Sequence, residues 1–136
     1  MDLLARREHS RLELQRKLIA RSFDASLVSA VLDELEQDDL LSAERFAQSF
    51  VASRYSRGQG PERIKRDLGE RGIEAAEIYL DDERFDWEAQ ARATRIKRFG
   101  SESPADFREK ARQMRFLEYR GFNQRQIRHA LEFEDE

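Results

Sequence analysis

Cysteine is absent from this 136-residue sequence, which also has only two prolines and six glycines. The lack of cysteine excludes disulfides, thiolate metal ligands and a cysteine nucleophile. No run of apolar residues exceeds three positions, which excludes a transmembrane helix. The first seven residues lack the apolar core of a secretory signal. These absences predict a soluble cytoplasmic protein that is held together by packing alone.

Charge is unevenly distributed along the chain, although the net charge is only −3. Residues 85–131 contain eleven Lys and Arg against six Asp and Glu, and residues 132–136 form an acidic tail. A basic segment inside an acidic protein indicates a charged partner such as nucleic acid, whereas a solvated helix face explains the same charges without a function.

Apolar residues recur three and four positions apart, which is the period of one buried helical face. Phe107, Ala111, Met114 and Leu117 follow this pattern. Sustained strict alternation is absent, and so are the Asn-Gly and Asp-Gly signals of hairpins. The sequence therefore predicts an all-α protein.

The chain also contains an internal repeat. Three seven-residue segments share a leucine, an arginine three positions later and a final apolar residue, and they lie 50 and then 49 positions apart. A further aliphatic residue follows each segment five positions later, at Val28, Ile78 and Ile127. Units of about 50 residues are long enough for three short helices. The three segments are Lys17–Phe23, Asp67–Ile73 and Phe116–Phe122.

Each repeated segment has the pattern of a helix C-terminus. With Gly72 as the left-handed residue, Leu68 and Ile73 occupy the positions that make contact in a Schellman motif. Gly121 has the same place in the third segment and Ser22 in the first, where a left-handed non-glycine residue costs roughly 1 kcal/mol. The caps expected for the helices that follow are Asp24, Asn123 (with Gln126 in a capping box) and the poorer Glu74.

These signals predict three tandem three-helix repeats that form an elongated, curved array. Such short helices are marginally stable alone, so their stability must come from packing within and between repeats. Repeat one has only residues 1–8 available for a first helix, which is therefore abbreviated. The predicted repeats cover residues 1–41, 42–84 and 85–136, the last with the acidic tail.

The second repeat has the clearest helix boundaries. Ser42 is expected to cap a helix that runs to about residue 56, and Pro61 to occupy the first position of the next helix. The third helix of this repeat is expected to end near Arg84. The helices expected in the third repeat lie near 86–99, 105–120 and 124–133.

Catalytic and metal-binding patterns are missing. The two histidines, His9 and His129, lack the spacing of metal ligands, and neither a phosphate loop nor a Gly-x-Ser-x-Gly elbow occurs. Carboxylates and cations alternate in a way that favours surface pairs such as Glu62 with Arg66. We therefore expect a protein that is not an enzyme and holds no metal or cofactor.

Cations surround the Gly58–Pro61 segment. A glycine-rich turn before a helix can hold a phosphate through free N–H groups, although a flexible turn with positive φ angles explains the same glycines without a ligand. An aromatic ring beside several cations can contact nucleic acid or an acidic protein groove. The candidate contact residues are Arg54, Tyr55, Arg57, Arg63, Lys65 and Arg66, and a second set is Arg112, Arg115 and Arg120.

Several segments together resemble the RecX regulatory proteins of bacteria. The match covers nearly the whole chain in the right order. Two departures are a first helix that is cut back and Ser22 in place of the glycine of the other two repeats. The segments that look like the family's opening, central and third signatures are Leu3–Leu14, Arg45–Tyr55 with Gly60–Ile64, and Arg115–Phe122.

The resemblance implies a regulator of RecA, the recombinase that coats single-stranded DNA as a helical ATPase filament. Members of the family bind this filament and typically suppress its ATPase, its strand exchange and its stimulation of repressor self-cleavage. An elongated array could touch several protomers, so that weak contacts add. By this resemblance we expect a monomer that binds the filament, first through Arg54, Tyr55, Arg57 and Arg63, with at most weak binding to DNA.

Two alternatives remain open. One is a sequence-independent DNA-binding array in which the basic segment holds phosphates and affinity falls steeply with salt. Its weakness is a pI of about 5.6, far from the basic value of most nucleic-acid domains. The other alternative is a helical-repeat scaffold with an unrelated partner.

Overall fold

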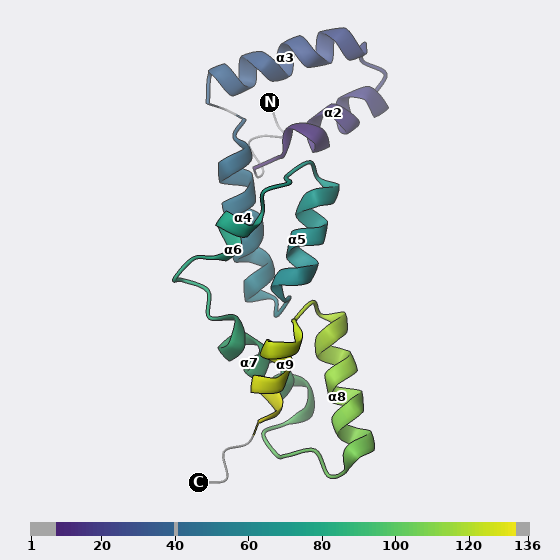
Figure 1. Ribbon diagram of the computed structural model, residues 1–136. Coiled ribbons are helices and arrows are strands. Elements are labelled where there is room, and N and C mark those ends of the chain that lie inside the picture. Colours follow the sequence, from purple (N-terminus) through teal and green to yellow (C-terminus); the bar gives the residue numbers. More distant parts are fainter. Residues whose placement is uncertain (1–7, 40, 133–136) are drawn as a thin grey trace.

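The computed structural model describes residues 8–39 and 41–132, and within them it contains eight helices and no strand. The helices form three groups that follow one another along an elongated molecule (Figure 1). We call these groups repeat one (α2 and α3), repeat two (α4 to α6) and repeat three (α7 to α9). The prediction of an all-α array of three repeats is confirmed. The helices are α2 (Arg11–Ala20), α3 (Ala25–Gln37), α4 (Ala43–Ser56), α5 (Pro61–Glu70), α6 (Glu77–Leu80), α7 (Trp87–Phe99), α8 (Phe107–Tyr119) and α9 (Gln124–Leu131).

Each repeat encloses its own hydrophobic core. In repeat two, Phe46 and Val51 of α4 pack with Ile64 and Leu68 of α5, and all four are at most 2% exposed. Trp87 of α7 packs against the cores of both repeat two and repeat three. Because each core is small, the array depends on such contacts between repeats for its stability.

Helix ends in the repeated segments follow the prediction. Ser22, Gly72 and Gly121 are left-handed, with φ angles of 70°, 87° and 101°. In each segment the N–H of the next residue donates to the leucine carbonyl five positions earlier, at 2.9–3.2 Å. This is the hydrogen bond of a Schellman motif, so the three segments terminate their helices in the same way.

Most predicted boundaries are also confirmed. Ser42 caps α4, which ends at Ser56, and Pro61 is the first residue of α5. Helix α8 begins slightly later than expected, because the side chain of Asp106 provides its N-cap. The first helix expected within residues 1–8 falls almost wholly outside the described residues.

The third helix of repeat two is much shorter than predicted, because α6 has four residues and does not extend to Arg84. Asp24 and Asn123 cap the equivalent helices in the other repeats through their side chains. At this position repeat two has Glu74, and α6 begins three residues later without a side-chain cap. Ile78 is 73% exposed, whereas Val28 and Ile127 at the equivalent positions of the other repeats are buried.

The apolar stripe predicted for α8 is buried only towards its C-terminal end. Leu117 is fully buried and Met114 packs against the core of repeat three, whereas Phe107 is 84% exposed. Phe107 is the first residue of α8, at the end of the array farthest from repeat two (Figure 1). The described residues include no fourth repeat that would cover this ring.

Candidate interaction surface

The loop over residues 57–60, which connects α4 to α5, contacts repeat three. The N–H groups of Gly60 and Glu62 donate to the carbonyls of Arg120 (2.7 Å) and Gly121 (2.9 Å). The first N–H groups of α5 therefore bind the C-terminal end of α8. These groups are not available to a phosphate, and packing between repeats accounts for the glycines.

Glycine is required on both sides of this junction. A Cβ on Gly60 would lie 2.3 Å from the carbonyl carbon of Gly121, and a Cβ on Gly121 would lie 2.3 Å from the Cβ of Arg63. Real Cβ atoms do not approach other atoms so closely, so neither position accepts a side chain without movement of the backbone. This close approach fixes the place of repeat three against α5.

Arg54 lies mostly inside repeat two rather than on its surface. Its guanidinium lies over the ring of Phe50, 4.4 Å from the centroid, and its Nη1 is 3.5 Å from Oδ2 of Asp67. Burial lowers the pKa of Arg54, and the positive charge of Arg71 lowers it further. These contacts give Arg54 a structural role as well as a charge.

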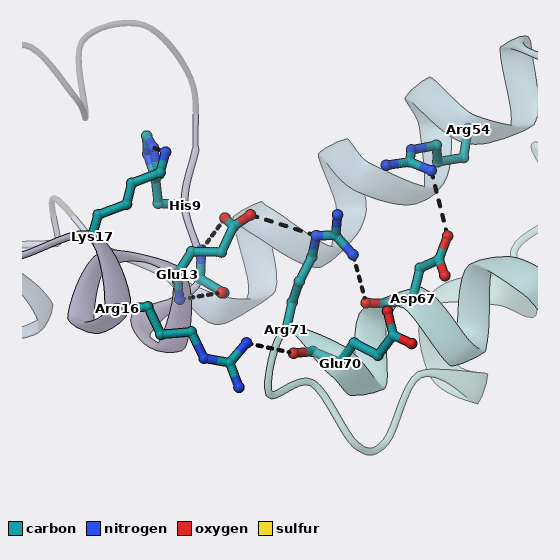
Figure 2. A network of polar contacts seen from close by, with 9 residues as sticks. His9, Glu13, Arg16, Lys17, Arg54, Asp67, Glu70 and Arg71 are labelled. Carbon is teal, nitrogen blue, oxygen red and sulfur yellow. Dashed lines mark hydrogen bonds and ion pairs between the residues drawn. The ribbon is translucent and has the colours of Figure 1, made fainter. Parts of the chain in front are cut away.

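Arg71 connects repeat two to repeat one (Figure 2). Its Nε lies 3.5 Å from Oε2 of Glu13 in α2, and its Nη1 donates to the α5 carbonyl four residues earlier at 2.9 Å. Beside it, Nη1 of Arg16 donates to the carbonyl of Glu70 at 3.3 Å. Arg71 is not among the residues predicted from the sequence to be functional, although it occupies the same place in its segment as Arg120.

Tyr55 packs inward as well. Its ring centroid lies 4.9 Å from that of Phe85 and 5.1 Å from that of Trp87. Its hydroxyl accepts a hydrogen bond from the N–H of Asp86 at 3.2 Å. The ring therefore helps to join α4 to the start of α7, and it does not stand free as a platform for stacking a base.

Arg63 and Lys65 of α5 both have partners within the chain. The guanidinium of Arg63 lies 5.5 Å from the ring centroid of Tyr119, and its Nε is 4.0 Å from Oδ2 of Asp67. Nζ of Lys65 lies 2.6 Å from Oε1 of Glu77 in α6, and this hydrogen bond raises the pKa of Lys65. Arg63 thus faces repeat three, whereas Lys65 holds the short helix α6.

Arg57 and Arg66 are exposed, as is Lys65. Arg57 forms no ion pair with any described residue. Arg66 lies 3.7 Å from the carboxylate of Asp67, which it shares with Arg54 and Arg63. Because three arginines share one carboxylate, positive charge dominates this part of repeat two.

The second set of candidates is divided between two places. Arg112 and Arg115 lie on α8, where Arg112 pairs with the carboxylate three residues before it (3.0 Å) and Arg115 is exposed. Arg120 instead reaches across to repeat two, where its Nε donates to the carbonyl of Gly58 at 3.2 Å and its Nη2 to that of Arg57. The structure therefore brings Arg120 and Arg57 together, although they belong to different clusters in the sequence.

The candidate residues together comprise exposed guanidinium groups and arginines that hold the repeats together. In the described part of the chain, no group of three or more His, Asp or Glu side chains could hold a metal ion. The same residues contain no helix that is long and apolar enough to cross a membrane. The arrangement is suited to binding an anionic partner through several separate contacts.

Comparison with known proteins identifies the family. Its models for the first, second and third three-helix domains of RecX match residues 1–35, 44–78 and 86–131. The chain is 50% identical over 138 aligned positions to regulatory protein RecX of Halorhodospira halophila, an alignment that covers 100% of this chain and 86% of that relative. The chain belongs to the RecX family.

Other RecX proteins give the same result. Regulatory protein RecX of Pseudomonas fluorescens strain Pf-5 is 44% identical over 96% of this chain and 86% of that protein. The crystal structure of RecX from Lactobacillus salivarius shares the fold, with a TM-score of 0.76 at 20% identity over 95% of this chain and 87% of that one. The resemblance found in the sequence is confirmed. A regulatory role follows from it, since these RecX relatives are named as regulatory proteins.

Proposed function

We propose that this RecX protein binds the filament that RecA forms on single-stranded DNA and lowers its ATP hydrolysis, strand exchange and co-protease activity. The observation that carries the proposal is the membership of the whole chain in a family of regulatory proteins. The elongated stack of repeats adds support, because it can contact several protomers of a helical assembly at once (Figure 1).

The nine candidate residues contribute in different ways under this proposal. Arg57, Arg66 and Arg115 are exposed and can contact the filament directly. Arg54, Tyr55, Arg63 and Arg120 are partly buried and have contacts within the chain, so their replacement would also move the repeats. A clean test therefore needs an exposed residue. Lys65 and Arg112 are also exposed, but each forms a short ion pair (2.6 and 3.0 Å, against 3.7 Å for Arg66), so they have weaker claims as direct contacts.

The test is a titration of RecA ATP hydrolysis on single-stranded DNA with the wild-type protein and with Arg66→Glu. We expect Arg66→Glu to raise the concentration for half-inhibition by about fivefold or more, because it reverses the charge of an exposed candidate contact residue. Arg84→Glu is the matched control, since Arg84 belongs to the same repeat and its side chain is 64% exposed against 66% for Arg66. Equal inhibition by Arg66→Glu and the wild type would remove this face of α5 from the contact.

Sequence-independent DNA binding is the second candidate function. The observation that favours it is the number of exposed cations in repeat three, which include Arg108, Lys110, Arg115 and Arg128. A parallel titration on bare single-stranded DNA separates the two functions. Inhibition at concentrations that leave bare DNA unbound supports the filament, whereas inhibition that follows DNA occupancy and falls steeply with salt supports DNA binding.

A further inference from the structure

A cavity of about 430 Å³ lies where repeats two and three meet. It is lined by the loop after α4, by one face of α7 and by the C-terminal half of α8. Four cations line it, and among the described residues no carboxylate does. None of the four forms an ion pair with a described residue. The cations are Arg57, Lys97, Arg98 and Arg120.

The walls of the cavity are held in place by packing and by hydrogen bonds. Gly58 has a φ angle of 79°, and a Cβ at this position would lie 2.9 Å from Oγ1 of Thr94. Only glycine therefore lets the loop approach α7 so closely. Arg120 is fixed by its bonds to the carbonyls of Gly58 and Arg57, which leave other N–H groups of its guanidinium without an acceptor among the described residues.

The cavity also has an aromatic floor and a buried hydroxyl in its wall. Phe116 is partly buried, and the guanidinium of Arg98 lies 5.8 Å from its ring centroid. Thr94 is only 9% exposed, and its Oγ1 has no hydrogen-bond partner within the described part of the chain. Buried hydroxyl groups are nearly always hydrogen-bonded, so this one marks a place where the protein alone does not complete the polar contacts.

Four cations without a carboxylate repel one another, and a bound anion would relieve that repulsion. We propose that this cavity binds phosphate groups. A terminal phosphate carries nearly two charges near neutral pH and each backbone phosphodiester carries one, and both accept the paired N–H groups of arginine. Two or more linked phosphates therefore balance the cluster better than one carboxylate does. The volume falls in the range of about 300–1,000 Å³ that is usual for small-ligand sites. The phosphates can come from a free nucleotide or from a nucleic-acid strand, which have the same oxyanion chemistry.

The probe for the shared chemistry is inorganic tripolyphosphate, measured by calorimetry at fixed ionic strength with no recombinase present. We expect Lys97→Gln with Arg98→Gln to weaken binding by about tenfold or more, because two charge-assisted contacts are lost. Both residues are exposed, so the pair leaves the junction between repeats intact. Arg21→Gln with Arg84→Gln is the matched control, which removes the same charge from two exposed positions outside the cavity and outside the cations of repeat three.

Two further arms identify the source of the phosphate. Displacement of tripolyphosphate by ATP alone assigns a free nucleotide, and displacement by an oligo(dT) strand assigns a nucleic-acid backbone; either result supports the site. If the variant and the control lose the same affinity for tripolyphosphate, the proposal is overturned in favour of general charge attraction. If a polyglutamate peptide displaces tripolyphosphate as well as ATP or oligo(dT) does, it is overturned in favour of an acidic protein segment. Because these assays contain no RecA, their failure leaves the proposed inhibition of the filament untouched.

Discussion

Replacing Gly60 with alanine tests whether the close contact between two backbones holds repeats two and three together. Gly60 has a φ angle of −88°, which alanine adopts without strain. Through the unfolded state, alanine would even stabilise the protein by about 0.4–1 kcal/mol, because an alanine residue loses less conformational entropy than glycine on folding. Any loss of stability must therefore come from the new Cβ, which would meet the backbone of Gly121 at 2.3 Å.

The size of the effect follows from this geometry. Carbon atoms pack at about 3.5–4.0 Å, so the two backbones would have to separate by roughly 1 Å or more. That movement breaks the hydrogen bonds from Gly60 and Glu62 to the C-terminal end of α8, each with a net value of about 0.5–1.5 kcal/mol. With the strain of overpacking added, we expect Gly60→Ala to lower the free energy of unfolding by about 2–4 kcal/mol.

The assay is urea-induced unfolding followed by far-ultraviolet circular dichroism. Gly69→Ala is the control within the same helix, because a Cβ at Gly69 meets nothing within 4 Å. This substitution should stabilise the protein by about 0.8–1 kcal/mol, the usual helix preference for alanine over glycine. The reasoning would be refuted by a Gly60→Ala protein as stable as the wild type, or by equal losses in the two variants.

Two further predictions concern helix ends. Ser22→Gly should stabilise the fold by about 0.5–1 kcal/mol in the same assay, because Ser22 is left-handed at a φ angle of 70°; a loss of stability would mean that the serine side chain makes a contact of greater value. The side-chain hydroxyl of Ser26, together with the N–H groups of Ser26 and Leu27, lowers the pKa of Asp24. The folded-state pKa lies below the unfolded one, so this contribution is complete above pH of about 4 and is lost as the pH falls through the lower value. Asp24→Asn, which keeps a good capping residue, should flatten the acid limb of a stability–pH curve; an unchanged limb would contradict this assignment.

The features that the sequence predicted well are local ones. Leu117, Gly121 and Phe122 lie within six residues, and their order alone specifies how α8 ends. Short-range signals also give the caps at Asp24 and Ser42. The length predicted for α6 was wrong, because no short-range signal in the sequence shows how far an uncapped segment remains irregular before its helix begins.

The candidate site was predicted less completely, since spacing gives the face of a helix but not what lies opposite. Arg54 and Tyr55 belong to a basic cluster in the sequence, yet they pack against Phe50 and Trp87. The contact between Gly60 and Gly121 joins positions far apart in the chain, and neither glycine has a local pattern that names the other. The sequence therefore shows where the cations lie along the chain, whereas the groups that they contact become known only from the fold.

The bonds between α5 and α8 have a consequence for how the protein can meet a partner. Unpaired N–H groups at the start of one helix are satisfied by unpaired carbonyls at the end of the next, so the two helices succeed each other with the same direction. If α8 were reversed, its unpaired N–H groups would face the N–H groups of α5, and neither could accept a hydrogen bond. The array is therefore polar, because its repeat-one end differs from its repeat-three end, and a partner with a direction of its own would distinguish the two orientations.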